Sequence, residues 1–361
     1  MTRRMAPLNR KRPGGMPGQR EMKAHVKSLS KWCARLAVSL GLIAGIAYFV
    51  PLAEVAAAIR TANLAYILAG WLLFFLGFYL GAWSLRILTA RLDVAIGTWA
   101  IFEVNLVTQF YQLFLPGGFV TGGLIRWYKI TRHDNKPAEV LAAILFNRML
   151  EVWSLAFLAL GFWLLEGPAL RQPVIGATLI ALFAGLCLLY AVAVSRRAFA
   201  LFEGLITRLP AALDRLKPHL LKLSGSLARF NGFGPGGHAT ILALAVLRNL
   251  VRIVSLVCLA HAIGLPVADI TLGWVRSFTQ LVNLLPISYA GLGVREVSLL
   301  VLLEPYGASK SAIVSLSMLW FSALLLTALL GGLLEARRLF RKARGSAASA
   351  AAVAGKRDRV S

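Results

Sequence analysis

Residues 98–130 read TWAIFEVNLVTQFYQLFLPGGFVTGGLIRWYKI, an apolar stretch that proline and glycine interrupt in the middle. A second stretch, residues 270–303, reads ITLGWVRSFTQLVNLLPISYAGLGVREVSLLVLL and is interrupted in the same way. Their uninterrupted arms are mostly shorter than the roughly 20 residues that a helix needs to cross a bilayer. We therefore predict two re-entrant hairpins with broken backbone at membrane depth, and the alternative is two kinked full spans in each stretch.

The two interruptions resemble each other. Each contains a Leu-Pro pair, a later glycine and then an arginine, at spacings that agree within one residue, namely Leu115-Pro116, Gly122 and Arg126 against Leu285-Pro286, Gly291 and Arg295. If one hairpin enters from each side of the membrane, this pattern is an inverted repeat around a site near the bilayer midplane. The alternative is a chance similarity between two proline and glycine breaks. The residues that break the backbone are Pro116, Gly117, Gly118, Gly122, Gly123, Pro286, Gly291 and Gly293.

Six further apolar segments are long enough, or nearly so, to cross a bilayer as helices. They are Leu36–Val50, Asn63–Leu88, Ala138–Leu165, Pro173–Val194, His238–Ile263 and Ser311–Leu334. The predicted fold class is therefore an all-α polytopic integral membrane protein, with about six full spans and the two broken hairpins.

The composition of the 361 residues agrees with that fold class. Hydrophobic residues make up 58% and charged residues only 15%, against about 45–50% and about 25% in soluble domains, so a soluble globular enzyme is excluded. The formal net charge is +24. In so apolar a chain, anionic membrane lipid is a better partner for that charge than nucleic acid. The three cysteines and five histidines show no metal-ligand spacing, and we expect no metal and no cofactor.

Charged segments flank and divide the apolar region. Residues 1–31 are predicted to form a basic disordered tail, and residues 345–361 an Ala/Ser-rich disordered tail with a basic end. Residues 196–230 are predicted to lie on the cytoplasmic surface as an amphipathic stretch. With both termini in the cytoplasm, only three of the 39 lysines and arginines fall in external loops (Arg60, Arg171 and Lys310). The positive-inside rule therefore favours this topology.

The second interruption carries a recognisable motif. The run Leu284-Leu285-Pro286-Ile287-Ser288-Tyr289-Ala290-Gly291-Leu292-Gly293-Val294-Arg295-Glu296 resembles the signature of the flippase-like transmembrane domain of lysylphosphatidylglycerol synthases and their stand-alone relatives. The first interruption and the segment Asn147-Arg148-Met149-Leu150-Glu151 resemble further motifs of that family. The likeness covers roughly residues 32–340, and we assign residues 32–344 to this domain.

The resemblance implies an integral protein of the cytoplasmic membrane that is associated with lipid translocation. The full synthases also carry a soluble aminoacyl-transfer domain after the membrane part. The sequence leaves no room for such a domain after Leu334. We therefore expect no lysyl transfer by this chain and no enzyme activity.

Charged residues at membrane depth are costly, about 2.5–3.5 kcal/mol each, and usually face a cavity or a partner. The candidate ligands for a lipid head group are Arg126, Arg248, Arg252 and Arg295, because arginine binds phosphate with two parallel hydrogen bonds. Charge-balancing or structural roles are assigned to Glu103, Arg148, Glu151, Arg276 and Glu296. The structural alternatives are an ion pair between Arg148 and Glu151, snorkelling of Arg248 and Arg252 to the interface, an ordinary interfacial anchor at Arg126, and helix packing or tight turns at the glycines.

Two functions follow from this reading. The first is movement of a lipid with an anionic head group between leaflets, through a polar site near the midplane. The alternative is a membrane-embedded lipid-binding partner or subunit of a separately encoded enzyme that modifies a lipid or a lipid-linked sugar. No nucleic-acid partner is expected.

Overall fold

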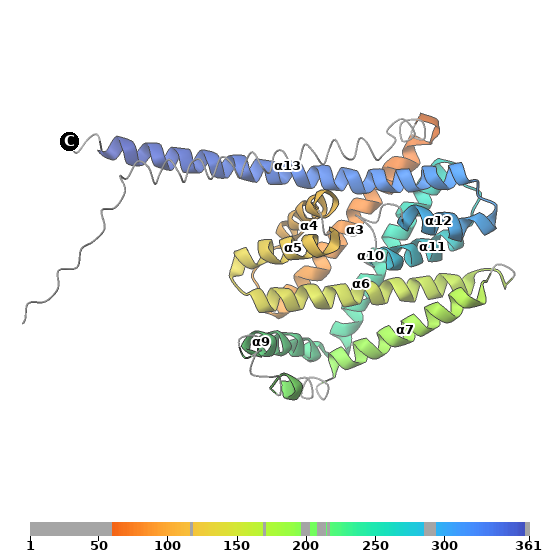
Figure 1. Ribbon diagram of the computed structural model, residues 1–361, viewed down its shortest axis with the longest axis horizontal. Coiled ribbons are helices and arrows are strands. Elements are labelled where there is room, and N and C mark those ends of the chain that lie inside the picture. Colours follow the sequence, from red (N-terminus) through yellow and green to blue (C-terminus); the bar gives the residue numbers. More distant parts are fainter. Residues whose placement is uncertain are drawn as a thin grey trace, which may run out of the picture. The chain divides into compact units, whose positions relative to one another are not determined.

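A computed structural model describes the backbone of residues 60–115, 118–168, 171–195, 203–207, 214, 217–284 and 294–357. The chain divides into two compact units, Met1–Pro51 and Leu52–Ser361, and the described residues all belong to the second. Every regular element among them is a helix (Figure 1). The α-helices are α3 Leu64–Arg91, α4 Thr98–Phe114, α5 Gly118–Asp134, α6 Pro137–Leu165, α7 Pro173–Val194, α9 Lys217–Ala228, α10 Gly234–Ala262, α11 Asp269–Val282, α12 Val294–Leu303 and α13 Lys310–Arg357, with short 3₁₀ turns η3 Arg229–Phe233 and η4 Glu304–Tyr306.

Five segments are long and apolar enough to cross a membrane, which confirms the all-α polytopic prediction. They are α3, α6, α7, the continuous segment Lys217–Ala262 that ends with α10, and Lys310–Arg341 of α13. They coincide with five of the six predicted spans. The sixth, Leu36–Val50, lies outside the described residues.

The arms of both broken stretches are short helices. Helices α4 and α5 have 17 residues each, α11 has 14 and α12 has 10, so their lengths are about 15–26 Å. The hydrocarbon core is roughly 30 Å thick. The two helices of each stretch also pack against each other, as re-entrant hairpins require. The turns between them, which contain Pro116, Gly117, Pro286, Gly291 and Gly293, lie outside the described residues.

The first hairpin, α4–α5, opens at the end of the molecule where α3 finishes. The backbone amide of Ala95, just before α4, donates to Oδ2 of Asp134 at the end of α5 (3.0 Å). Nζ of Lys136 also contacts Asp134, at 3.0 Å, and Arg229 forms an ion pair with Asp93. The start of α4 and the end of α5 are therefore joined at the same end of the molecule, where Lys136 and Arg229 also lie.

The second hairpin, α11–α12, opens where α3 begins. There, Thr271 of α11 and Tyr306 just after α12 both donate to Oε2 of the buried Glu166 (2.8 and 3.4 Å). The amide of Asn63 donates to the carbonyl oxygen of Ala262 at the same end (2.8 Å). Because α3 has 28 residues, the two ends are about 42 Å apart. The hairpins enter from opposite ends (Figure 1), which is the inverted arrangement that the sequence predicted.

The long helices approach one another closely at glycines. Helices α3 and α10 share an extensive contact, in which Ser255 Oγ donates to the carbonyl oxygen of Gly70 (2.6 Å). Helix α13 crosses α4 at Gly331, where a Cβ would overlap the carbonyl oxygen of Leu106. Small residues allow such backbone approach between membrane helices, where van der Waals packing replaces the hydrophobic effect as the main attraction.

The C-terminal segment differs from expectation, and the connecting stretch 196–230 is described only in part. The backbone of α13 stays helical to Arg357, through most of the segment 345–361 for which we expected disorder. Alanine, which dominates that segment, has the highest helix propensity. In the stretch 196–230, α9 lies with Ser224 and Ser226 buried while Lys222 is exposed. Much of the stretch lies outside the described residues, and its amphipathic, cytoplasmic character stays a prediction.

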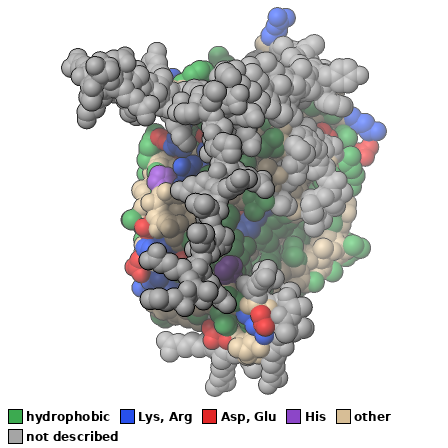
Figure 2. Space-filling view, turned by 60° about the vertical axis from the view of Figure 1, so that its left-hand side comes forward, with side chains coloured by type: hydrophobic (Ala, Val, Ile, Leu, Met, Phe, Trp, Pro, Cys, Tyr) green, Lys and Arg blue, Asp and Glu red, His purple; other side chains and the backbone are tan. Residues whose placement is uncertain are grey.

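The surface of the described helices is largely apolar. Helix α7 buries only Gly176 and Leu179, and side chains such as Val174 and Leu188 are more than two-thirds exposed. Where described residues are visible in Figure 2, many of them are green apolar side chains, and the charged groups form small separate sets. Such a surface suits contact with lipid chains rather than water.

Candidate functional site

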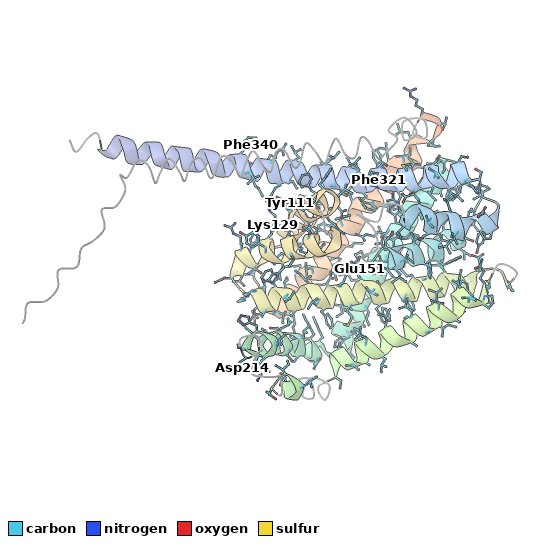
Figure 3. The ribbon with its side chains drawn as sticks, viewed as in Figure 1. Tyr111, Lys129, Glu151, Asp214, Phe321 and Phe340 are labelled. Carbon is cyan, nitrogen blue, oxygen red and sulfur yellow. The ribbon has the colours of Figure 1, made fainter. Side chains whose placement is uncertain are left out.

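A group of charged side chains lies among α5, α6, α10 and α11. Glu151, near the middle of α6 (Figure 3), accepts a hydrogen bond on Oε2 from Nη1 of Arg148 at 2.8 Å. Its Oε1 lies 3.6 Å from Nη2 of Arg248 and 3.7 Å from Nη1 of Arg252, both on α10. The pairing of Arg148 with Glu151 that the sequence suggested is therefore present. It is part of a larger assembly, because two arginines of a second helix approach the same carboxylate.

Two more arginines join this assembly from the hairpins. Arg276 of α11 is only 2% exposed, places Nη1 3.5 Å from Oδ1 of Asn249, and lies within electrostatic range of Glu151. Arg126 of α5 is half-buried and interacts electrostatically with Glu151 and Arg248. We call these six residues the central cluster: Arg126, Arg148, Glu151, Arg248, Arg252 and Arg276.

The central cluster has far more positive than negative charge. Its five guanidinium groups face one carboxylate, so its formal charge is +4. Among the described residues, no hydrogen-bond partner is found for Nε of Arg126, Arg248, Arg252 or Arg276, nor for Nη2 of Arg248. Burying a charged donor without a partner costs several kcal/mol unless a charge of opposite sign approaches. The arrangement is therefore suited to receive an anion.

Two glycines of α3 make room for the arginines of α10. A Cβ at Gly77 would lie 2.8 Å from Cγ of Arg252, and one at Gly81 would lie 3.3 Å from Cδ of Arg248. The guanidinium of Arg252 also lies 5.2 Å from the ring centroid of Phe78, within the range of a cation–π contact. The roles of Gly77 and Gly81 were not predicted from the sequence. The signal was the Gly77-x-x-x-Gly81 pattern in an apolar span, which is typical of close helix contacts.

Buried neutral groups hold the cationic helices in register. Nδ2 of Asn249 donates to Oγ of Ser154 on α6 at 2.7 Å, while Oδ1 of the same amide faces Arg276. A second contact joins α3 to α6, where Ser84 Oγ donates to Oδ1 of Asn147 at 2.9 Å. Ser84, Ser154 and Asn249 were not predicted from the sequence, and Asn147 was named only as part of a family motif. Asn249 is an isolated asparagine in an apolar span, and the amides of such residues usually form hydrogen bonds to a neighbouring helix. This pattern could have predicted the contact.

Arg295 lies in a different environment. On α12 it donates from Nη2 to Oε1 of Glu296 at 2.6 Å and from Nε to Oγ of Ser317 on α13 at 3.0 Å. Its guanidinium also lies 5.8 Å from the ring of Trp320 and 5.3 Å from that of Phe321. The structure thus gives Arg295 partners on both α12 and α13, and we name Arg295, Glu296 and Ser317 the α12–α13 site.

The other sequence candidates hold the helices together. Glu103 of α4 forms an ion pair with Arg338 of α13. Close by, Glu335 of α13 accepts from Lys129 of α5 at 2.7 Å and from Tyr111 of α4 at 3.1 Å (Figure 3). These contacts attach α13 to the first hairpin and do not place Glu103 in the central cluster.

The glycine breaks that the structure describes differ in whether they permit a close contact between helices. Gly118 begins α5. At Gly122 a Cβ would lie 3.1 Å from Cβ of Gln112, so this glycine permits contact between α4 and α5, whereas Gly123 faces open space. Among the described residues, no group of three or more His, Cys, Asp or Glu side chains is placed to hold a metal ion.

Comparison with known proteins identifies the family. The model of the lysylphosphatidylglycerol synthase TM region matches residues 32–332, which is most of the chain. No curated protein and no solved structure matches the sequence. The match covers a transmembrane region, in agreement with the helical, multi-pass structure, and it includes every member of the central cluster and of the α12–α13 site. The chain belongs to the family of the lysylphosphatidylglycerol synthase transmembrane region, with a role connected with membrane lipids.

Proposed function

We propose that the protein moves a lipid with an anionic head group between the leaflets of the cytoplasmic membrane, and that the central cluster binds this head group. The observation that carries the proposal is the excess of arginine over carboxylate in the cluster, with buried N–H groups for which the described residues supply no partner. Arginine suits the task because its planar guanidinium remains charged and matches the oxygens of a phosphate.

The proposed roles within the cluster follow from the contacts. Arg126, Arg248, Arg252 and Arg276 supply the unpartnered donors and bind the head group. Glu151 limits the repulsion between them, and Arg148 holds Glu151 by its 2.8 Å hydrogen bond. Arg276 was expected to balance charge, and it is proposed here as a ligand because it is buried without a carboxylate within hydrogen-bond distance among the described residues. Arg295, which was expected to be a ligand, is proposed to fasten α12 to α13.

The two hairpins give the proposed site access from either side. They open at opposite ends of the molecule, and one arm of each, α5 and α11, contributes an arginine to the cluster. Small movements of the hairpins would expose the arginines alternately to the two leaflets. We place the end with Arg91, Arg132 and Lys136 in the cytoplasm because of the positive-inside rule, with both termini on that side.

A leaflet-exchange assay tests this function. The purified chain is placed in liposomes with head-group-labelled phosphatidylglycerol or phosphatidylcholine, and an external quencher reports which label is accessible. We expect exchange of the anionic lipid only, slowed tenfold or more by Arg248→Gln, because a hydrogen bond to a charged group contributes roughly 1.5–3 kcal/mol.

The control is Arg132→Gln, which removes an exposed arginine outside the cluster and should leave exchange unchanged. Exchange of both lipids at equal rates would refute the proposed site. Binding of anionic lipid without exchange, by well-folded protein, would instead support the role of a lipid-binding partner for a separately encoded enzyme.

A further inference from the structure

The charge of the central cluster exceeds what one phosphodiester can neutralise. We propose that the head group it binds is a diphosphate, carried on a lipid. This inference rests on the proposed function and narrows its substrate class. It is drawn from the number and burial of the cluster's donors that lack a partner among the described residues, and from the helices that supply them.

The first step is the charge of the central cluster, which favours a diphosphate over a phosphodiester. Each of Arg248 and Arg276 is less than 5% exposed, so neither charge is screened by water. Glu151 forms a hydrogen bond of 2.8 Å with Arg148, while its contacts with Arg248 and Arg252 are ion-pair distances of 3.6 and 3.7 Å, too long for hydrogen bonds. The formal charge of +4 would fall only to +3 on binding a phosphodiester, which carries a single negative charge. A diphosphate carries roughly two to three negative charges at neutral pH.

The second step is the position of the donors. The unpartnered N–H groups come from three helices: Arg126 on α5, Arg248 and Arg252 on α10, and Arg276 on α11. A phosphodiester has only two non-bridging oxygens, which one guanidinium can occupy with its two parallel hydrogen bonds. A diphosphate has about twice as many acceptors, separated by a bridging oxygen, and can therefore engage arginines from several helices at once.

The third step is the contrast with the α12–α13 site. There the protein neutralises Arg295 with Glu296 and Ser317, which shows that the fold can satisfy a buried arginine internally. The central cluster has four arginines whose Nε atoms find no partner among the described residues. Their missing counter-charge is therefore expected from a ligand.

The fourth step is the source of the diphosphate. Most of the cluster lies on α6 and α10, which belong to segments long enough to span a membrane. The same two helices expose apolar side chains such as Leu145, Leu247 and Val254. A diphosphate that reaches this depth does so most favourably with an attached hydrocarbon chain, because the chain remains in the bilayer. Free pyrophosphate shares the head-group chemistry and is distinguished by experiment.

Binding is measured on the purified full-length chain in detergent, by the ligand-dependent rise in its unfolding temperature and by titration. The probes are farnesyl diphosphate, farnesyl monophosphate, farnesol and inorganic pyrophosphate. We expect farnesyl diphosphate to bind at least tenfold more tightly than the monophosphate and than pyrophosphate, with no saturable binding of farnesol. Arg276→Gln and Arg248→Gln should each weaken binding of farnesyl diphosphate at least tenfold, so that its affinity approaches that of farnesyl monophosphate. Arg132→Gln should change neither affinity.

The variants Arg276→Lys and Arg248→Lys keep the test valid if the glutamine variants do not fold, because they retain charge and lose the planar two-donor geometry. They should weaken the diphosphate more than the monophosphate. Equal binding of the two farnesyl phosphates, or equal binding of pyrophosphate and farnesyl diphosphate, would overturn the inference. If phosphatidylglycerol exchange is selective and the diphosphate does not bind, the inference fails and the proposed function stands. If the chain neither exchanges phosphatidylglycerol selectively nor binds the diphosphate, the inference and the proposed function both fail.

Discussion

Arg126 and Arg295 occupy matching positions in the two broken stretches, yet the groups that surround their side chains differ. Arg295 is enclosed by a carboxylate, a hydroxyl and two aromatic rings. Arg126 faces a cluster in which four other arginines share one carboxylate, and its Nε has no partner among the described residues. Arg295 is thus paired within the protein, whereas Arg126 belongs to a cluster whose described residues carry more positive than negative charge.

The difference begins with the neighbouring residue. Arg295 is followed by Glu296, which pairs with it directly at 2.6 Å, whereas Arg126 is followed by Trp127, whose indole donates to the carbonyl oxygen of Pro137. An arginine at membrane depth is therefore not by itself a ligand site. Its role depends on whether the surrounding helices supply the compensating charge.

The largest effect is expected when the central cluster loses its carboxylate. Glu151→Gln leaves five arginines without the one acidic group that the described residues place among them, and removing one partner of a buried ion pair costs about 3–5 kcal/mol. We expect a strong loss of folded protein, measured as a lower unfolding temperature and poor recovery on gel filtration. Added anionic lipid should restore stability more in this variant than in the wild type. Stability equal to wild type in neutral detergent would contradict the account of the cluster.

A smaller effect, and the most direct comparison, comes from replacing one arginine in each site by methionine. Arg295→Met leaves Glu296 without its cation, so we expect a loss of roughly 2–3 kcal/mol with unchanged lipid selectivity. Arg276→Met removes an uncompensated charge, and it should abolish anion selectivity without a comparable loss of stability. The double variant Arg295→Met/Glu296→Met should recover most of the stability. The same response of both single variants in both measurements would remove the distinction between the sites.

A third test concerns the space that α3 provides for α10. Gly77→Ala puts a Cβ 2.8 Å from Cγ of Arg252, which forces the arginine or the helix to shift at a cost of about 1–2 kcal/mol. Unfolding temperature and lipid exchange should both decrease. The matched control is Gly161→Ala on α6, where a Cβ meets nothing within 4 Å. An equal loss in the control would indicate a general effect of alanine and not a contact with Arg252.

The smallest effect is expected at an ion pair exposed to water. The hydrogen bond and charge of Arg229 hold the pKa of Asp93 below its ordinary value. The pair therefore stabilises the fold at and above the ordinary aspartate pKa, and this contribution is lost as pH falls through the lowered value. Asp93→Asn should lower the unfolding temperature slightly at neutral pH, and the difference from wild type should disappear in acid. A difference that grows as the pH falls would have the wrong sign.

Much of the fold was accessible from the sequence because it depends on local properties. Five spans were predicted near their observed limits, since twenty or more consecutive apolar residues are sufficient to mark a crossing helix. The proline and glycine breaks indicated two short-armed hairpins, and the distribution of Lys and Arg predicted that they would open at opposite ends. The extent of α13 was underestimated, because the alanine content that suggested low complexity also favours helix.

The sequence by itself therefore determined the class of protein, the spans, the breaks and the excess of positive charge, all of which are sums over neighbouring residues. Only the tertiary structure decided which arginines share a site. Arg126 on α5 is far along the chain from Arg248 on α10 and Arg276 on α11, yet it joins them, while Arg295 is directed to α13. The physical reason is that pairing between charges depends on how helices are rotated and how closely they approach, as at Gly77 and Gly81, and no local pattern contains that geometry.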